Sequence, residues 1–96
     1  MRIDKAEALA AVGVIRKYLG SSAAVWLFGS RADDSQKGGD VDLYVETDKT
    51  DLAIPIARAR GELADVLGRY VDLVVNNHTR NSAIYEVAKS QGVRLA

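Results

Sequence analysis

The chain has 96 residues, of which 48% are hydrophobic and 27% are charged, and it contains no cysteine. This length suits a single domain spanning residues 1–96, and the lack of cysteine excludes disulfides and thiolate metal sites. Thirteen basic residues balance thirteen acidic ones, which argues against a broad basic surface and so against direct nucleic-acid binding.

The first element predicted is an amphipathic helix over about residues 4–19. Its apolar residues recur at helical spacing, namely Leu9, Val12, Ile15 and Leu19. Gly20 follows as the expected C-cap residue. The apolar run Ala23–Phe28 then predicts a strand covered on both faces. It is also the longest wholly apolar run and is too short to cross a bilayer. Because the N-terminus lacks the apolar core of a signal peptide, we expect a cytoplasmic protein without a membrane partner.

A polar segment over residues 29–39, with a glycine at each end, predicts a loop. Strict alternation over residues 40–46 then predicts a half-buried strand with Val41, Leu43 and Val45 facing the core. A second helix is marked by apolar residues at helical spacing: Leu52, Ile56, Ala59, Leu63 and Val66. Thr50 or Asp48 is its expected N-cap, and Pro55 lies in the first turn, where proline is tolerated.

Alternation returns over residues 71–75 and predicts a third strand. Thr79 is the expected cap of a short last helix that carries Ile84, Val87 and Ala88, and residues 93–95 form an expected edge strand. The order α-β-loop-β-α-β-α-β predicts an α/β (α+β) fold, a small mixed sheet of about four strands flanked by helices.

Two aspartates in the second strand carry the first chemical signal. Side chains two residues apart in a strand project to the same side, so Asp40 and Asp42 lie together while Val41 enters the core. Neighbouring ionised carboxylates repel each other, and a divalent cation relieves that repulsion. Oxygen-only ligands suit Mg²⁺, with Mn²⁺ as the alternative.

The third strand and the loop complete the pattern. Asp72 alternates with Val71 and Leu73, and if its strand neighbours the second one, three carboxylates converge on one patch. That arrangement can hold two metal ions for in-line phosphoryl or nucleotidyl displacement. Gly29 and Ser30 directly follow a strand, where backbone N–H groups and a hydroxyl can cradle phosphate oxygens.

Taken together, Gly29-Ser30, nine intervening residues, Asp40-Val41-Asp42 and Val71-Asp72-Leu73 resemble the signature of the DNA polymerase β-type nucleotidyltransferase superfamily. The Gly-Ser-Arg-Ala sequence is most similar to its minimal nucleotidyltransferase (MNT) branch, which includes the MntA-like antitoxins of HEPN/MNT toxin–antitoxin systems. The loop between Ser30 and Asp40 is one residue shorter than is common there.

The resemblance implies a role for each motif residue. Asp40, Asp42 and Asp72 would be catalytic and would hold Mg²⁺, with Asp72 helping to activate the attacking hydroxyl. Gly29, Ser30 and Arg31 would bind the triphosphate of ATP. The expected enzyme is a protein adenylyltransferase that transfers AMP to a hydroxyl, expected to be tyrosine, of a HEPN-domain ribonuclease toxin. It would act as the antitoxin in a hetero-oligomer.

Other interpretations stay open. The chain could be a non-catalytic module that neutralises a partner toxin by binding it, with vestigial carboxylates. Transfer to a small molecule is disfavoured because no second domain is present to bind one. Tyr44 shares a face with the aspartates and is a candidate for lining the nucleotide site or a partner contact. Trp26 is expected in the core, and His78, the only histidine, on the surface.

Overall fold

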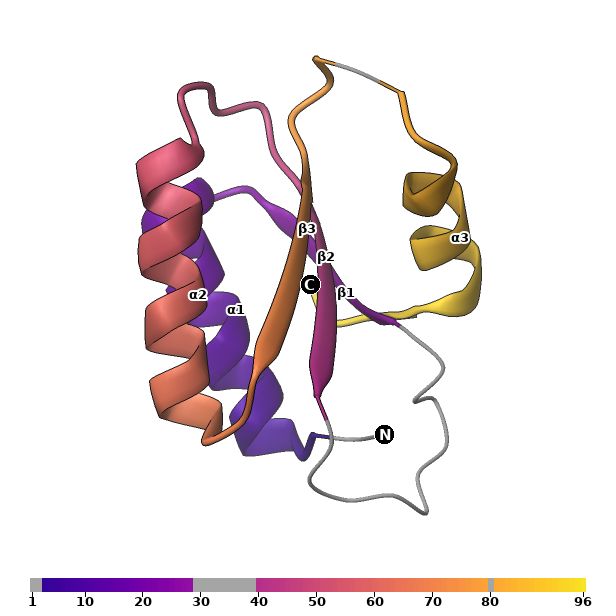
Figure 1. The fold of residues 1–96 in the computed structure, drawn as a ribbon. Helices are drawn as coiled ribbons and strands as arrows, with labels where there is room; N and C mark the ends of the chain where they lie inside the picture. The colour runs from indigo at the N-terminus through magenta and orange to yellow at the C-terminus, as the bar shows by residue number, and fades with distance from the viewer. Residues whose placement is uncertain (1–2, 29–39, 80) are drawn as a thin grey trace.

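The computed structural model describes residues 3–28, 40–79 and 81–96 of the chain (Figure 1). Helix α1 (Lys5–Leu19) leads into strand β1 (Ala24–Phe28), and strand β2 (Val41–Glu46) is followed by helix α2 (Ala53–Leu67). Strand β3 (Val71–Asn76), helix α3 (Ala83–Gln91) and the short strand β4 (Val93–Arg94) complete the order. This is the element order predicted from the sequence.

The four strands form one mixed sheet in the order β3-β2-β1-β4. Strand β2 runs parallel to β3 and antiparallel to β1, and β4 is antiparallel to β1. Helices α1 and α2 cover one face of the sheet, whereas α3 covers the other (Figure 1). The described part of the chain is thus an α+β fold of three layers, with β3 at an exposed edge.

The helix ends partly follow the sequence signals. The Asp4 side chain accepts a hydrogen bond from the Glu7 backbone N–H and the Glu7 side chain returns the contact, which makes a capping box at the start of α1. Gly20 is its C-cap, as predicted, with φ of 118°. Helix α2 begins after Leu52 without a side-chain cap, so the predicted caps Thr50 and Asp48 are wrong.

The main core lies between the sheet and the pair α1 and α2. It contains the odd-numbered residues of β2 and β3, and α1 and α2 contribute small as well as large side chains, among them Ala11, Ile15, Ala59 and Leu63. Two predicted core positions are wrong, because Leu9 is 67% exposed and Val66 is 47% exposed. Alanines such as Ala11 and Ala59 are fully buried in these helices, whereas these two larger side chains face solvent.

A second, smaller core lies beneath α3. It consists of Trp26 from β1, Tyr44 from β2, and Tyr85 and Ala88 from α3. This burial confirms that β1 is covered on both faces. Helix α3 begins after Ser82, and Thr79 instead donates a hydrogen bond to the Asn77 side chain, so the predicted Thr79 cap is wrong.

The predicted apolar face of α3 is displaced by one residue. Ile84 and Val87 are 41% and 42% exposed, while Tyr85 turns inward and is 6% exposed. Ala88 is buried as predicted. Among the described residues, none of the helices is long and apolar enough to span a membrane.

Candidate active site

Asp42 and Asp72 lie side by side on the sheet face opposite α1 and α2. They are register partners in the parallel β2–β3 pair. Their strand neighbours Val41, Leu43 and Val71 are almost fully buried on the other face. The alternation predicted for both strands is therefore confirmed, and so is the condition that the two strands are neighbours.

The third aspartate lies at the start of the same strand. Asp40 is exposed and directly precedes β2, and the next backbone N–H, that of Val41, donates to the Tyr70 carbonyl at 3.0 Å. Asp42 is half-buried and Asp72 is exposed. On its other side, Asp42 is paired across the antiparallel ladder with Phe28, the last residue of β1. The carboxylates thus occupy the solvent-accessible end of β2 and β3.

Within residues 3–28, 40–79 and 81–96, no three acidic, histidine or cysteine side chains are clustered tightly enough to hold a metal ion. The donor chemistry nevertheless suits Mg²⁺, because Asp42 and Asp72 present carboxylate oxygens from register-paired positions. Two like charges held opposite each other repel, and a divalent cation between them would relieve that repulsion. The Asp42–Asp72 pair therefore fits Mg²⁺, and the three-carboxylate set stays a prediction.

The predicted phosphate-binding residues Gly29, Ser30 and Arg31 lie outside the described residues. The strand that precedes them is described, and its last residue, Phe28, stands beside Asp42. The predicted phosphate-binding segment therefore begins, in the sequence, directly after a residue that is paired with Asp42. The assignment of these three residues to the triphosphate stays a prediction.

Tyr44 does not line the site. It is fully buried between Trp26 and Tyr85, with ring centroids 5.3 Å and 5.7 Å away. Its hydroxyl donates to Glu46 Oε2 at 2.7 Å and accepts from Asn76 Nδ2 at 3.1 Å. Burial, more than these contacts, raises the pKa of Tyr44 to about 12. Tyr44 is thus a neutral structural residue, which packs in the second core on the same face of the sheet as the aspartates.

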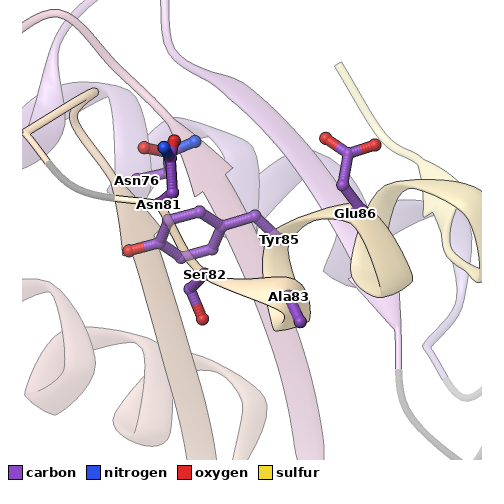
Figure 2. Close-up of a pocket in the computed structure, with 6 residues that line it drawn as sticks. All are labelled: Asn76, Asn81, Ser82, Ala83, Tyr85 and Glu86. Carbon is purple, nitrogen blue, oxygen red and sulfur yellow. The ribbon is translucent and has the colours of Figure 1, made fainter.

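A depression of about 350 Å³ opens at the opposite end of the same face. It lies between β3 and the start of α3 and is lined by Asn76, Asn81, Ser82, Ala83, Tyr85 and Glu86 (Figure 2). Asn76 is the last residue of β3, whereas Asp72 lies near its beginning. This depression is therefore separate from the aspartates, with the row of Trp26 and Tyr44 between them.

His78 lies just beyond β3, at that far end. Its Nε2 is 3.5 Å from Asp48 Oδ1, and both side chains are largely exposed. The prediction of a surface histidine rather than a catalytic base is consistent with this place.

The sequence matches the family described as "Polymerase beta, Nucleotidyltransferase" over residues 14–95. The chain belongs to this family. The matched range contains all four strands and both helices that follow β2, so the aspartates stand within the nucleotidyltransferase domain. No curated protein sequence matches the chain.

Solved structures with the same nucleotidyltransferase fold include chains from toxin–antitoxin complexes. One is the tri-AMPylated Shewanella oneidensis HEPN toxin in complex with MNT antitoxin, at a TM-score of 0.76 and 21% identity, with coverage of 98% of this chain and 72% of that one. A MntA–HepT complex matches at a TM-score of 0.75 and 20% identity, over 97% of this chain and 72% of that one. A toxin–antitoxin structure with AMP-PNP matches at a TM-score of 0.76 and 22% identity, over 98% of this chain and 73% of that one.

One residue beside the aspartates is absent from the sequence-based prediction. Tyr70, immediately before β3, is 64% exposed at the same end of the sheet. The signal was present, since Tyr70 precedes Asp72 by two positions and strand alternation puts both on one face.

Proposed function

We propose that the chain is a Mg²⁺-dependent protein adenylyltransferase that transfers AMP from ATP to a tyrosine hydroxyl of a HEPN-domain toxin, acting as its antitoxin in the cytoplasm. The observation that carries this proposal is the register pairing of Asp42 and Asp72 in a domain of the polymerase β nucleotidyltransferase family. A pure binding module gains little from two like charges held opposite each other, whereas metal-dependent phosphoryl chemistry uses such paired carboxylates.

In this proposal Asp40, Asp42 and Asp72 would hold Mg²⁺, which when bound would neutralise charge on the phosphates. The exposed carboxylate of Asp72 accepts the proton of the attacking hydroxyl. Gly29 and Ser30 bind the outer phosphates through backbone N–H groups and the hydroxyl, and Arg31 steadies the triphosphate. The attacking oxygen approaches the α-phosphorus opposite the departing pyrophosphate.

The choice of nucleotide and acceptor is supported by the structural neighbours. One of them contains an AMPylated HEPN toxin with an MNT antitoxin, and another contains AMP-PNP. In the described part of the chain, β3 is an edge strand and Asp72 on it is exposed, which suits a large acceptor. A partner's tyrosine can therefore reach the carboxylates from the β3 side.

The test is transfer of α-³²P label from ATP, with Mg²⁺, to proteins in a lysate of the native host. Wild type, Asp40→Ala/Asp42→Ala and the control Asp65→Asn are compared, since Asp65 is an exposed aspartate of α2 on the other side of the sheet. We expect a labelled protein with wild type and with the control but not with the double variant. Equal labelling by a folded double variant would overturn the mechanism.

A second function, neutralisation of the toxin by binding alone, is favoured by one observation. Helix α3 exposes Ile84 and Val87 on its outer surface, which is apolar area suited to a protein contact. The discriminating measurement is whether a chain without Asp40, Asp42 and Asp72 still suppresses the toxicity of the HEPN protein. Full suppression by that variant would favour binding over catalysis, and loss of suppression would favour catalysis.

A further inference from the structure

Tyr70 belongs to the aspartate face of the sheet although it precedes β3. Its carbonyl accepts the Val41 N–H at 3.0 Å, so the β2–β3 ladder extends to this residue and places it across from Asp40. The residues on either side point to the helical layer: Arg69 pairs with Glu7 of α1 at 3.0 Å, and Val71 is 1% exposed. Alternation therefore turns the Tyr70 ring to the side of Asp72.

Tyr70 differs from the other three tyrosines of the chain. Tyr44 and Tyr85 are buried in the second core. The Tyr18 hydroxyl donates to Glu62 Oε1 at 2.7 Å, on the side of α1 and α2. Tyr70 is 64% exposed, and within the described residues its hydroxyl has no hydrogen-bond partner. Tyr70 is thus the tyrosine whose hydroxyl oxygen is accessible to react with a bound nucleotide.

The order of strands puts this hydroxyl on the acceptor side of the site. Strand β1 leads to the proposed phosphate-binding residues, β2 carries Asp40 and Asp42, and β3 carries Asp72. In an in-line displacement the attacking oxygen stands opposite the departing pyrophosphate. If the residues that follow β1 in the sequence bind the outer phosphates, as the proposed function has it, attack comes from the β3 side, where Tyr70 lies.

We propose that the Tyr70 hydroxyl is itself a nucleotidyl acceptor, so that the chain modifies its own active-site edge. This inference rests on the proposed adenylyl transfer. The phenolic oxygen forms a bond to the α-phosphorus, and the bond from that phosphorus to the oxygen bridging to the β-phosphate breaks. Pyrophosphate leaves with the bonding electron pair, and the phenolic proton passes to the Asp72 carboxylate. The product is a phosphodiester that joins the Tyr70 phenolic oxygen to the 5′ oxygen of adenosine.

This modification would regulate the site. A nucleotide attached to Tyr70 stands beside Asp72, where a partner's hydroxyl has to enter. The modified chain is therefore expected to transfer AMP to a partner more slowly than the unmodified chain.

The experiment incubates the purified full chain with α-³²P ATP and Mg²⁺, with no partner present. Wild type is compared with Tyr70→Phe, with the matched control Tyr18→Phe, and with Asp40→Ala/Asp42→Ala. Intact mass and peptide mapping then locate the added group, and thermal melts check that each variant is folded. We expect one AMP on Tyr70 in wild type and in Tyr18→Phe, and loss of the label in the other two variants.

Equal labelling of wild type and Tyr70→Phe, or an AMP mapped to another residue, would overturn the inference. A parallel arm with host lysate separates this failure from failure of the proposed function. If wild type labels a lysate protein but not itself, self-modification is wrong while adenylyl transfer stands. If wild type labels neither, both are wrong.

Discussion

The chemical role that we propose for Asp72 is separate from its place in the fold. Its side chain is exposed and its neighbours Val71 and Leu73 hold the strand to the core. We predict that Asp72→Asn slows AMP transfer by about 10²–10⁴-fold, the usual contribution of a general base. The free energy of unfolding without metal should change by no more than about 0.5 kcal/mol, as for exposed sites. The measurements are single-turnover labelling and urea denaturation, and an unchanged transfer rate would contradict the role.

Tyr44 predicts a stability effect at high pH. Its pKa in the folded chain is raised to about 12, whereas an unfolded tyrosine titrates near pH 10. Below about pH 10 both the folded and the unfolded chain keep the phenolic proton, so the stability that Tyr44 contributes is fully present. Between the two values only the unfolded chain releases it, so stability falls as pH rises, by up to about 3 kcal/mol.

Tyr44→Phe should flatten this alkaline loss of stability. At neutral pH the variant should lose about 1 kcal/mol, because the hydrogen bonds to Glu46 and Asn76 disappear. Urea denaturation from pH 8 to about 12 measures both effects, with Tyr70→Phe as an exposed control. Parallel curves for wild type and Tyr44→Phe would show that Tyr44 titrates normally.

At the level of elements, periodicity predicts each helix and strand but not always the buried side of a helix. Leu9 and Ile84 fit the helical spacing, yet both are exposed while Ala11 and Tyr85 are buried. Which side of a helix is buried depends on its packing against the sheet. A small side chain such as Ala11 or an aromatic ring such as Tyr85 can occupy the contact in place of a larger aliphatic residue. The buried face of a strand is easier to predict, because side chains alternate between only two faces. In β2 and β3 the charged aspartates mark the face that is not in the main core.

The junction between α3 and β4 gives a prediction about packing. A Cβ added to Gly92 would overlap the Ala88 carbonyl oxygen and lie 2.9 Å from the Leu27 carbonyl oxygen. Gly92→Ala should therefore destabilise the chain by about 1–3 kcal/mol, the usual cost of overpacking. Gly61→Ala is the matched control: that glycine lies within α2 with nothing within 4 Å of the added atom.

The control should stabilise the chain by about 0.5–1 kcal/mol, since alanine is the better helix former. Thermal melts of the two variants beside wild type measure both changes. Equal melting temperatures for Gly92→Ala and wild type would mean that β4 shifts to accept the methyl group.

For the molecule as a whole, the sequence indicates which residues could form the site but not how the strands bring them together. The aspartate spacing and the family resemblance are properties of short segments. That β3 stands beside β2, and that Asp42 meets Asp72 in register, depends on strand order and on the crossover through α2. The placement of Tyr44 under α3 likewise depends on a tertiary contact that no local pattern contains.

Ligand binding should be visible in the stability of the whole chain. A ligand that binds only the folded state stabilises it by about 2.7 kcal/mol at a hundred times its Kd. We predict that ATP with Mg²⁺ raises the melting temperature of wild type, that EDTA cancels the rise, and that Asp40→Ala/Asp42→Ala shows none. A rise of equal size in the double variant would place nucleotide binding away from the aspartates.

The edge position of β3 has a consequence for how firmly the two aspartates are held together. Asp72 meets Asp42 only while β3 remains hydrogen-bonded to β2, its one neighbour in the sheet. Proteins open locally with free energies that range up to that of global unfolding. Any opening of β3 would separate Asp72 from Asp42, and hydrogen exchange of the β3 amides measures how often this happens.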